Sequence, residues 1–244
     1  QNTAGNYAPT GVYYDNMTAT VAEPTPAPTP APTPAPATAD DLFISEMGEG
    51  PSGTDSWGKY LEIANFTGAD VSLDGYLLGK IVNGGDPYES FGTFTSGATI
   101  SDGDVWVIGR CNSINNGQCD ASGGQPASLG DQIDQEDTFI SHNGDDAYGL
   151  LKGTETDYTV VDVFGPSETY SDPGSYHTAC GTERTYNSSW VKKADKEGTN
   201  SWSTSAGTSL EDCHWTIVPQ SSDNLDYTTV GNHTFTGEAE AANN

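Results

Sequence analysis

Residues 59–80 read KYLEIANFTGADVSLDGYLLGK and contain two short apolar runs, 60–65 and 76–80, separated by residues typical of turns. Each run has the length of a β-strand and is bounded by Gly, Asp or Asn. Thr67-Gly68 indicates one tight turn, and Asp74-Gly75 predicts another in which Gly75 has a positive φ. The segment therefore predicts two strands of an antiparallel sheet.

Similar runs recur along the rest of the chain, at 42–46, 105–109, 147–151 and 160–164, and 214–218 is a plausible closing strand. No segment shows a sustained apolar repeat of helical period. Short strands at this spacing, separated by turn residues, are typical of an antiparallel β-sandwich. The fold class predicted for residues 40–237 is therefore all-β.

The order of several segments points to a family. The pieces are LFISE (42–46), KYLEIANFTGADVSLDG (59–75), ISDGDVWVI (100–108), NGDDA (143–147), VVDVFG (160–165) and VGNH (230–233). Together they resemble the lamin-tail domain, an immunoglobulin-like β-sandwich found in nuclear lamins and in many secreted microbial proteins. The resemblance covers about residues 40–237, with insertions at 84–95, 111–138 and 182–212. It implies an adhesion or scaffold module and contributes no catalytic residue.

Residues 23–39 form a separate linker, with Pro at every second position from Pro24 to Pro36. Each Pro fixes φ and removes a backbone donor, so the segment is expected to be an extended polyproline II rod. At about 3.1 Å per residue, the sixteen residues 23–38 would span roughly 50 Å. A flexible tether or an O-glycosylated stalk is the alternative, with Thr25, Thr29 and Thr33 as the acceptors.

Residues 1–22 form an N-terminal arm that carries the alternation of one strand. Its members are Val12, Tyr13, Tyr14, Met17, Ala19 and Val21, of which Tyr13, Met17, Ala19 and Val21 share one face, interrupted by Asp15. A single strand needs a partner edge for its backbone and a core for its apolar face. We therefore expect the arm to add to a sheet elsewhere.

The formal net charge of −27 excludes several partners. Binding of nucleic acid or of an anionic membrane requires Lys and Arg, of which the chain has only 8, so neither partner is expected. The chain begins at Gln1 without an apolar leader, as after removal of a signal peptide, so a secreted or cell-surface protein is expected. Residues 238–244 form an acidic C-terminal tail.

The four cysteines contain no C-x-x-C pair, which favours disulfides over a zinc or redox site. Three pairings exist, and we favour the two local ones, Cys111 with Cys119 and Cys180 with Cys213. Sequons that could accept N-linked glycans begin at Asn16, Asn65, Asn187 and Asn232.

No constellation in the sequence indicates an enzyme. The four histidines are scattered, and neither a nucleophile elbow nor a phosphate-binding loop is present. No cofactor is expected, apart from a candidate calcium site at Asp131, Asp134 and Asp137, for which a solvated acidic loop is the plainer reading. Trp57, Trp190 and Trp202 lie in turn-rich sequence and are candidates for a glycan or protein contact.

The sequence therefore predicts a structural subunit of an extracellular filament, with other copies of itself as its partners. The arm of one subunit would insert into the sandwich of the next, and a contact that does not close on itself gives an open polymer. The alternative is a monomeric, secreted carbohydrate- or calcium-binding adhesion module on a glycosylated stalk. An enzyme is the third and weakest hypothesis.

Overall fold

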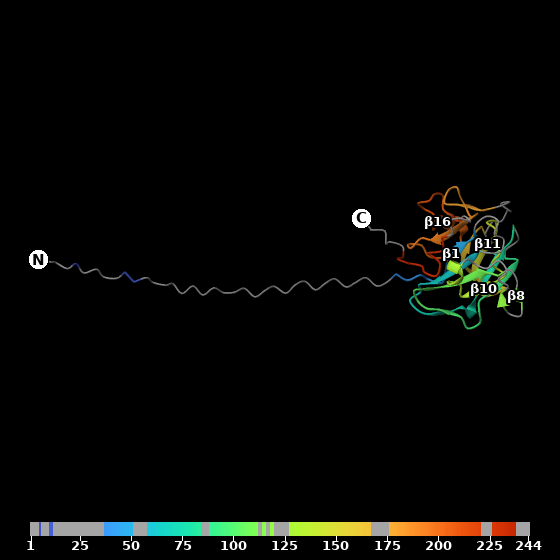
Figure 1. Ribbon diagram of the computed structural model, residues 1–244, viewed down its shortest axis with the longest axis horizontal. Helices are drawn as coiled ribbons and strands as arrows, with labels where there is room; N and C mark the ends of the chain where they lie inside the picture. The colour runs from blue at the N-terminus through green and yellow to red at the C-terminus, as the bar shows by residue number, and fades with distance from the viewer. Residues whose placement is uncertain are drawn as a thin grey trace. The chain divides into compact units, whose positions relative to one another are not determined.

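The computed structural model describes residues 5, 10–11, 37–50, 58–83, 88–111, 114–115, 118–119, 127–166, 176–220 and 226–237. The chain divides into two units, Gln1–Ala35 and Pro36–Asn244, and all the strands and helices below belong to the second (Figure 1). Within the described ranges, no helix is long and apolar enough to span a membrane.

Two mainly antiparallel sheets form the sandwich. The six-stranded sheet has the order β10 (Gln135–Asp137), β7 (Asp104–Arg110), β2 (Tyr60–Asn65), β1 (Phe43–Gly48), β15 (Ser188–Lys192) and β16 (Trp215–Pro219). Among its described pairs, only β10–β7 is parallel. The four-stranded sheet has the order β12 (Asp157–Phe164), β11 (Ala147–Thr154), β4 (Tyr76–Ile81) and β5 (Ser90–Thr93).

Short elements connect these strands. The two-stranded pairs are β3 (Val71–Ser72) with β6 (Thr99–Ile100), β8 (Ile114–Asn115) with β9 (Gln118–Cys119), and β13 (Thr178–Ala179) with β14 (Glu183–Arg184). The helices are the 3₁₀ turn η1 (Leu73–Gly75), α1 (Ala127–Gly130) and α2 (Trp202–Ala206).

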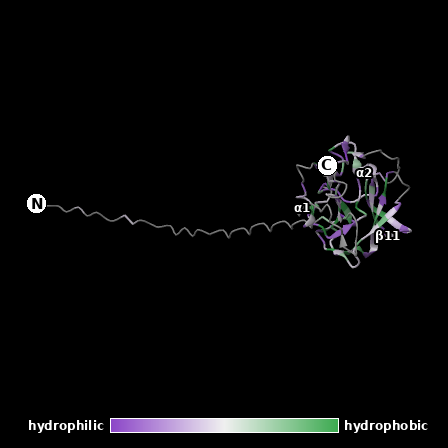
Figure 2. Ribbon diagram, turned by 45° about the vertical axis from the view of Figure 1, so that its right-hand side comes forward, coloured by the Kyte–Doolittle hydropathy of each residue, from purple (hydrophilic) through white to green (hydrophobic). Residues whose placement is uncertain are grey.

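The main core lies between the two sheets, and β1 shows how the sequence reaches it. Leu42 and Ile44 point into this core, while Phe43 lies on the opposite face of the sheet. A bulge between Ile44 and Glu46 shifts the alternation by one residue, so Met47 returns to the core. Apolar residues, green in Figure 2, accordingly gather on the strands.

The outer face of the six-stranded sheet is also covered, by residues 226–237. Tyr227 packs edge-on against Tyr60 of β2, and His233 and Phe235 pack against Phe43 of β1. Because both faces of β1 and β2 are covered, every residue of the two strands is buried. This cover explains why their sequences carry Glu46 and Glu62 beside large apolar residues and still form central strands.

The predicted antiparallel β-sandwich is confirmed, and each of the seven predicted strands overlaps an observed one. Two details differ. Asp74-Gly75 belongs to η1, and Gly75 is not among the glycines with positive φ. The stretch 182–212, which reads as an insertion, contains β15, which lies between β1 and β16 because the apolar Trp190 and Val191 continue the sheet.

Candidate functional site at the open edge of β5

Strand β5 is an edge strand of the four-stranded sheet, and among the described residues it pairs only with β4. The Thr93 carbonyl points away from β4, because it accepts a hydrogen bond from a side chain of the other sheet. Backbone groups alternate along a strand, so the N–H and C=O of Phe91 point the same way as those of Thr93. The edge therefore presents a row of peptide groups.

The side chain that pairs with this row is Gln135, from β10. Its amide donates to the Thr93 carbonyl (2.9 Å) and accepts from Thr95 N (2.9 Å). A residue on a neighbouring parallel strand would make the same two bonds through its backbone. Gln135 thus bridges the edge strands of the two sheets, and the described residues offer no such partner to Phe91.

Next to this bridge the seam between the two sheets opens into a pocket of about 380 Å³. Lys80, Val82 and residues 90–93 form one wall, and Asp137, Thr138, Phe139 and Ser141 form the other. Gly92 lets the Phe139 ring lie against β5, because a Cβ at that position would approach the ring to 2.8 Å. The pocket is therefore shaped by the edge strand itself.

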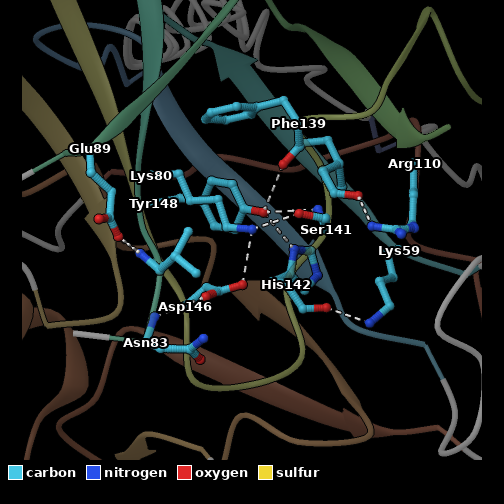
Figure 3. Close-up of polar contacts among 12 residues, drawn as sticks. Lys59, Lys80, Asn83, Glu89, Arg110, Phe139, Ser141, His142, Asp146 and Tyr148 are labelled. Carbon is cyan, nitrogen blue, oxygen red and sulfur yellow. Dashed lines mark hydrogen bonds and ion pairs between the residues drawn. The ribbon is translucent and has the colours of Figure 1, made fainter. Parts of the chain in front are cut away.

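A buried polar cluster, which we call the His142 cluster, holds the pocket wall in place (Figure 3). Its members are Lys59, Lys80, Ser141, His142, Asp146 and Tyr148. Lys80 forms a buried ion pair with Asp146 (3.0 Å) and donates to Ser141 Oγ (2.7 Å). Lys59 donates to the His142 carbonyl. The cluster joins β4, β11 and Lys59, the residue before β2, to Ser141, His142 and Asp146.

His142 itself is fixed and neutral. Its Nε2 lies 2.6 Å from the Gly48 carbonyl and therefore carries the proton, which leaves Nδ1 to accept from Tyr148 Oη (3.2 Å). Burial, followed by the charge of Lys59, holds the pKa of His142 well below its usual range. Both ring nitrogens are thus engaged without a carboxylate, and Ser141 Oγ is bonded to Lys80, so the cluster lacks the geometry of a nucleophilic triad.

The predicted donor strand, Val12, Tyr13, Tyr14, Met17, Ala19 and Val21, lies outside the described residues, as do Asn16, Thr25, Thr29, Thr33 and Trp57. The predicted disulfide between Cys180 and Cys213 is confirmed. Cys111 is also disulfide-bonded, while the side chain of Cys119, its predicted partner, lies outside the described residues.

Three predicted sites need correction. Asn65 is fully buried, and its amide donates to the Ala69 and Ile100 carbonyls (both 2.8 Å), which leaves no room for a glycan in the folded chain. Asn187 is half-buried and Asn232 is exposed, so these sequons stay predictions. Trp190 and Trp202 are core residues and not a binding surface, because each packs against Phe164.

The structure does not bring the three candidate calcium ligands together into one group. Asp134 accepts from Val107 N (2.9 Å) and Asp137 accepts from Phe139 N (2.9 Å), so both carboxylates cap backbone groups, and Asp131 is exposed. In the part of the chain that the structure describes, no group of three or more His, Cys, Asp or Glu residues is placed to hold a metal ion.

The paired sheets define the chain as an immunoglobulin-like β-sandwich, which agrees with a family match. A family model of the lamin tail domain matches residues 35–167, over half of the chain, so the chain belongs to the lamin tail domain family. Strands β15 and β16 lie beyond the matched residues but in the same sheet. Lamin tail domains are in general non-catalytic modules.

No curated protein matches the chain. A similar solved structure is the crystal structure of a DUF4876 family protein from Bacteroides thetaiotaomicron, with a TM-score of 0.39 and 11% sequence identity. The similarity covers 80% of this chain and 75% of that chain.

The sequence pattern does not reveal the β5 edge or Gln135, because both lie in stretches that read as insertions, 84–95 and 111–138. The signal that could have found β5 is the run ESFGTF at 89–94, which is bounded by turn residues and has the length of the other strands. No local pattern identifies Gln135, because its role depends on a contact 42 residues away in the chain.

Proposed function

We propose that this chain is a secreted structural subunit that polymerises head to tail. The strand of residues 12–21 in one copy adds to the sandwich of the next copy, and the Pro-rich linker bridges the two. The subunit is not an enzyme, and its principal partner is another copy of itself. The observation that carries the proposal is the open edge of β5, in a chain whose residues 12–21 have the sequence alternation of a strand.

The backbone groups of the arm strand and of the sheet edge can pair with each other. A lone strand has unpaired backbone groups and an apolar face, which only a sheet can satisfy. An exposed edge strand offers the matching row of donors and acceptors, and β-augmentation joins the two through main-chain hydrogen bonds. An open edge and a segment with the sequence pattern of a strand occur in the same chain, which supports assembly of identical copies into a polymer.

The charge distribution is compatible with this contact. Residues 1–35 contain only Asp15 and Glu23 as charged side chains, whereas the rest of the chain carries nearly all of the net charge of −27. A nearly neutral strand approaches the acidic sandwich with little repulsion, while sandwich bodies repel one another. The charge therefore favours the strand as the contact between copies.

The monomeric adhesion module has less in its favour. The tryptophans proposed for glycan stacking that the structure describes are in the core, and the described calcium ligands are dispersed. We therefore keep the filament as the one proposed function.

Deletion of residues 1–22 tests the proposal. Electron microscopy and light scattering should show filaments of the full chain and none of the truncated chain, whereas removal of residues 1–9 alone should leave filaments intact. Filaments formed by the chain without residues 1–22 would contradict strand donation.

A matched pair of point variants sharpens this test. Met17→Gln places an amide on the apolar face of the strand and should weaken assembly, while Thr18→Gln changes the opposite face and should not. Equal effects of both variants would indicate that the segment does not act as a strand.

A further inference from the structure

We infer that the arm strand of a second copy, residues 12–21, binds along the free edge of β5, beside Gln135 and over the pocket between the two sheets. This inference rests on the proposed function and names its acceptor. It commits to one edge of one sheet, although the two main sheets, as described, end in four edge strands, β5, β10, β12 and β16.

The edge of β5 is shown to accept peptide-like groups. The Gln135 side chain makes with Thr93 and Thr95 the two bonds that a strand would make there, and it does so at one end of the edge only. Toward the other end, the outward N–H and C=O of Phe91 extend the same row. An added strand continues this row past the point where the Gln135 amide stops.

The pocket provides a place for the apolar side chains of the arm. Successive side chains of an added strand point alternately into the seam between the sheets and out to solvent. On the arm, Tyr13, Met17, Ala19 and Val21 fall on one face, which Asp15 interrupts, and Tyr14, Asn16, Thr18 and Thr20 fall on the other. The pocket beside β5 has a volume of about 380 Å³, and Val82, Phe91 and Phe139 form an apolar part of a lining that is otherwise mostly polar. We place the apolar side chains of the arm against that part.

The other edges are less suited to an added strand. On β16 the last residue is Pro219, which has no N–H to donate. On β12 residue Val163 N already donates to the Thr199 carbonyl (3.1 Å), so the segment around residue 199 covers the end of this edge. Strand β10 has only three residues. Of these edges, β5 adjoins the pocket of about 380 Å³, whereas the pocket beside Val161 of β12 has a volume of about 100 Å³.

A proline placed on the edge tests the site directly. Thr93 is exposed, and its N–H points outward, so Thr93→Pro removes one donor from the edge and keeps the carbonyl that bonds to Gln135. The matched control, Thr93→Val, retains the N–H and the β-branched shape. We expect Thr93→Pro to abolish filaments of the full chain and Thr93→Val to form them like the unchanged protein, with similar thermal melting of both variants.

Hydrogen exchange is a second test, and it does not require that the Thr93→Pro variant folds. Amides of residues 91–95 should exchange more slowly in filaments than in Met17→Gln subunits, while those of β16 should not change. Filaments of Thr93→Pro, or unchanged exchange at residues 91–95, would overturn this site. Strand donation itself would still stand if removal of residues 1–22 prevents filaments, so the two proposals fail separately.

Discussion

Two buried pairs of ionisable side chains differ sharply in how their atoms are satisfied. Lys192 of β15 and Asp162 of β12 join the two sheets by an ion pair of 2.8 Å, and both side chains are fully buried. Glu46 of β1 and Glu62 of β2 lie opposite each other in one sheet and carry the same charge when ionised. The first pair holds opposite charges together, and the second brings like charges close.

The surroundings of the pairs follow this difference. Asp162 accepts bonds from the backbone N–H groups of Ile44 (2.8 Å), Val163 (2.9 Å) and Thr199 (2.8 Å), and the Lys192 ammonium lies 4.8 Å from the centre of the Trp215 ring. These contacts stabilise two ions. In contrast, Glu46 Oε2 has no hydrogen-bond partner among the described residues.

The carboxyl pair is therefore protonated under conditions in which carboxyls usually ionise. Burial, followed by repulsion from Glu62, raises the pKa of Glu46 to about 8, although bonds from Tyr60 and Thr229 oppose the rise. Burial raises the pKa of Glu62 to about 7. The stability of the fold thus depends on the charges of Lys192 and Asp162, and it depends on pH through Glu46 and Glu62.

The largest expected effect comes from breaking the opposite-charge pair. Lys192→Met should lower the free energy of unfolding by about 3–5 kcal/mol, because Asp162 is left charged in the core. Chemical denaturation of the two proteins measures the loss. In the double variant Lys192→Met/Asp162→Asn the uncompensated charge is gone, so part of the loss should be recovered. A loss in the single variant no greater than at an exposed pair would contradict this account.

The like-charge pair predicts a fall in stability as the pH rises. A carboxyl whose pKa is raised by folding binds its proton more tightly in the folded state, so its stabilisation is complete below the unfolded pKa of 4.5 and disappears as the pH passes the folded value. Between pH 6.5 and 8, Glu46, Glu62 and Glu49, whose pKa is about 7, should together remove roughly 2–3 kcal/mol.

The comparison of one variant with the unchanged protein isolates the carboxyl. Burial lowers the pKa of His177 and of His233 to about 4, so their contribution to stability falls as the pH drops through the unfolded value of 6.5, and it does so equally in both proteins. Thermal melting of Glu46→Gln across the same range should show a clearly shallower fall than the unchanged protein. A fall of equal steepness in both proteins would show that Glu46 is ionised throughout.

The two pairs also show how far the sequence predicts the structure. The sandwich follows from local patterns, since runs such as 60–65 and 76–80 mark strands through their length and bounding turns. Glu46 and Glu62 lie in β1 and β2 and do not interrupt the strand patterns. A polar residue within such a pattern normally predicts a side chain on the exposed face, so the sequence does not predict that these two are buried. Their burial depends on the segment 226–237, over 160 residues away, and no local pattern reports it.

Only half of the candidate site can be predicted from the sequence. The arm is identified by its alternation, but its acceptor is not, because β5 has four residues and contains Gly92, which weakens the strand signal. The pocket beside it depends on Phe139 and Gln135 lying against β5 from the other sheet. A contact between two sheets is a property of the folded chain and not of either segment.

A smaller effect is expected at the contact between the segment 226–237 and Glu46. Thr229 Oγ1 donates to Glu46 Oε1 (3.1 Å), so Thr229→Val should cost about 1 kcal/mol at pH 6.5, and more at pH 8, where the bond acts on an ionised carboxyl. The exposed Thr234 in the same segment provides the matched control, Thr234→Val. An equal loss for the two variants would show that the bond does not contribute.

The smallest loss of stability is expected at an exposed ion pair, which shows whether burial or N–O distance determines how much an ion pair contributes. Lys152 and Asp41 form an ion pair with the same N–O distance as Lys192 and Asp162, 2.8 Å, but the Lys152 side chain is 51% exposed. Water and salt screen such a pair, so Lys152→Met should cost only about 0.2–1 kcal/mol, and salt at about 1 M should remove most of this cost. The loss from Lys192→Met should persist in the same salt, because ions do not reach the core. If both losses shrank alike in salt, the Lys192 site would be open to solvent, and its ion pair would stabilise the sandwich no more than a surface contact.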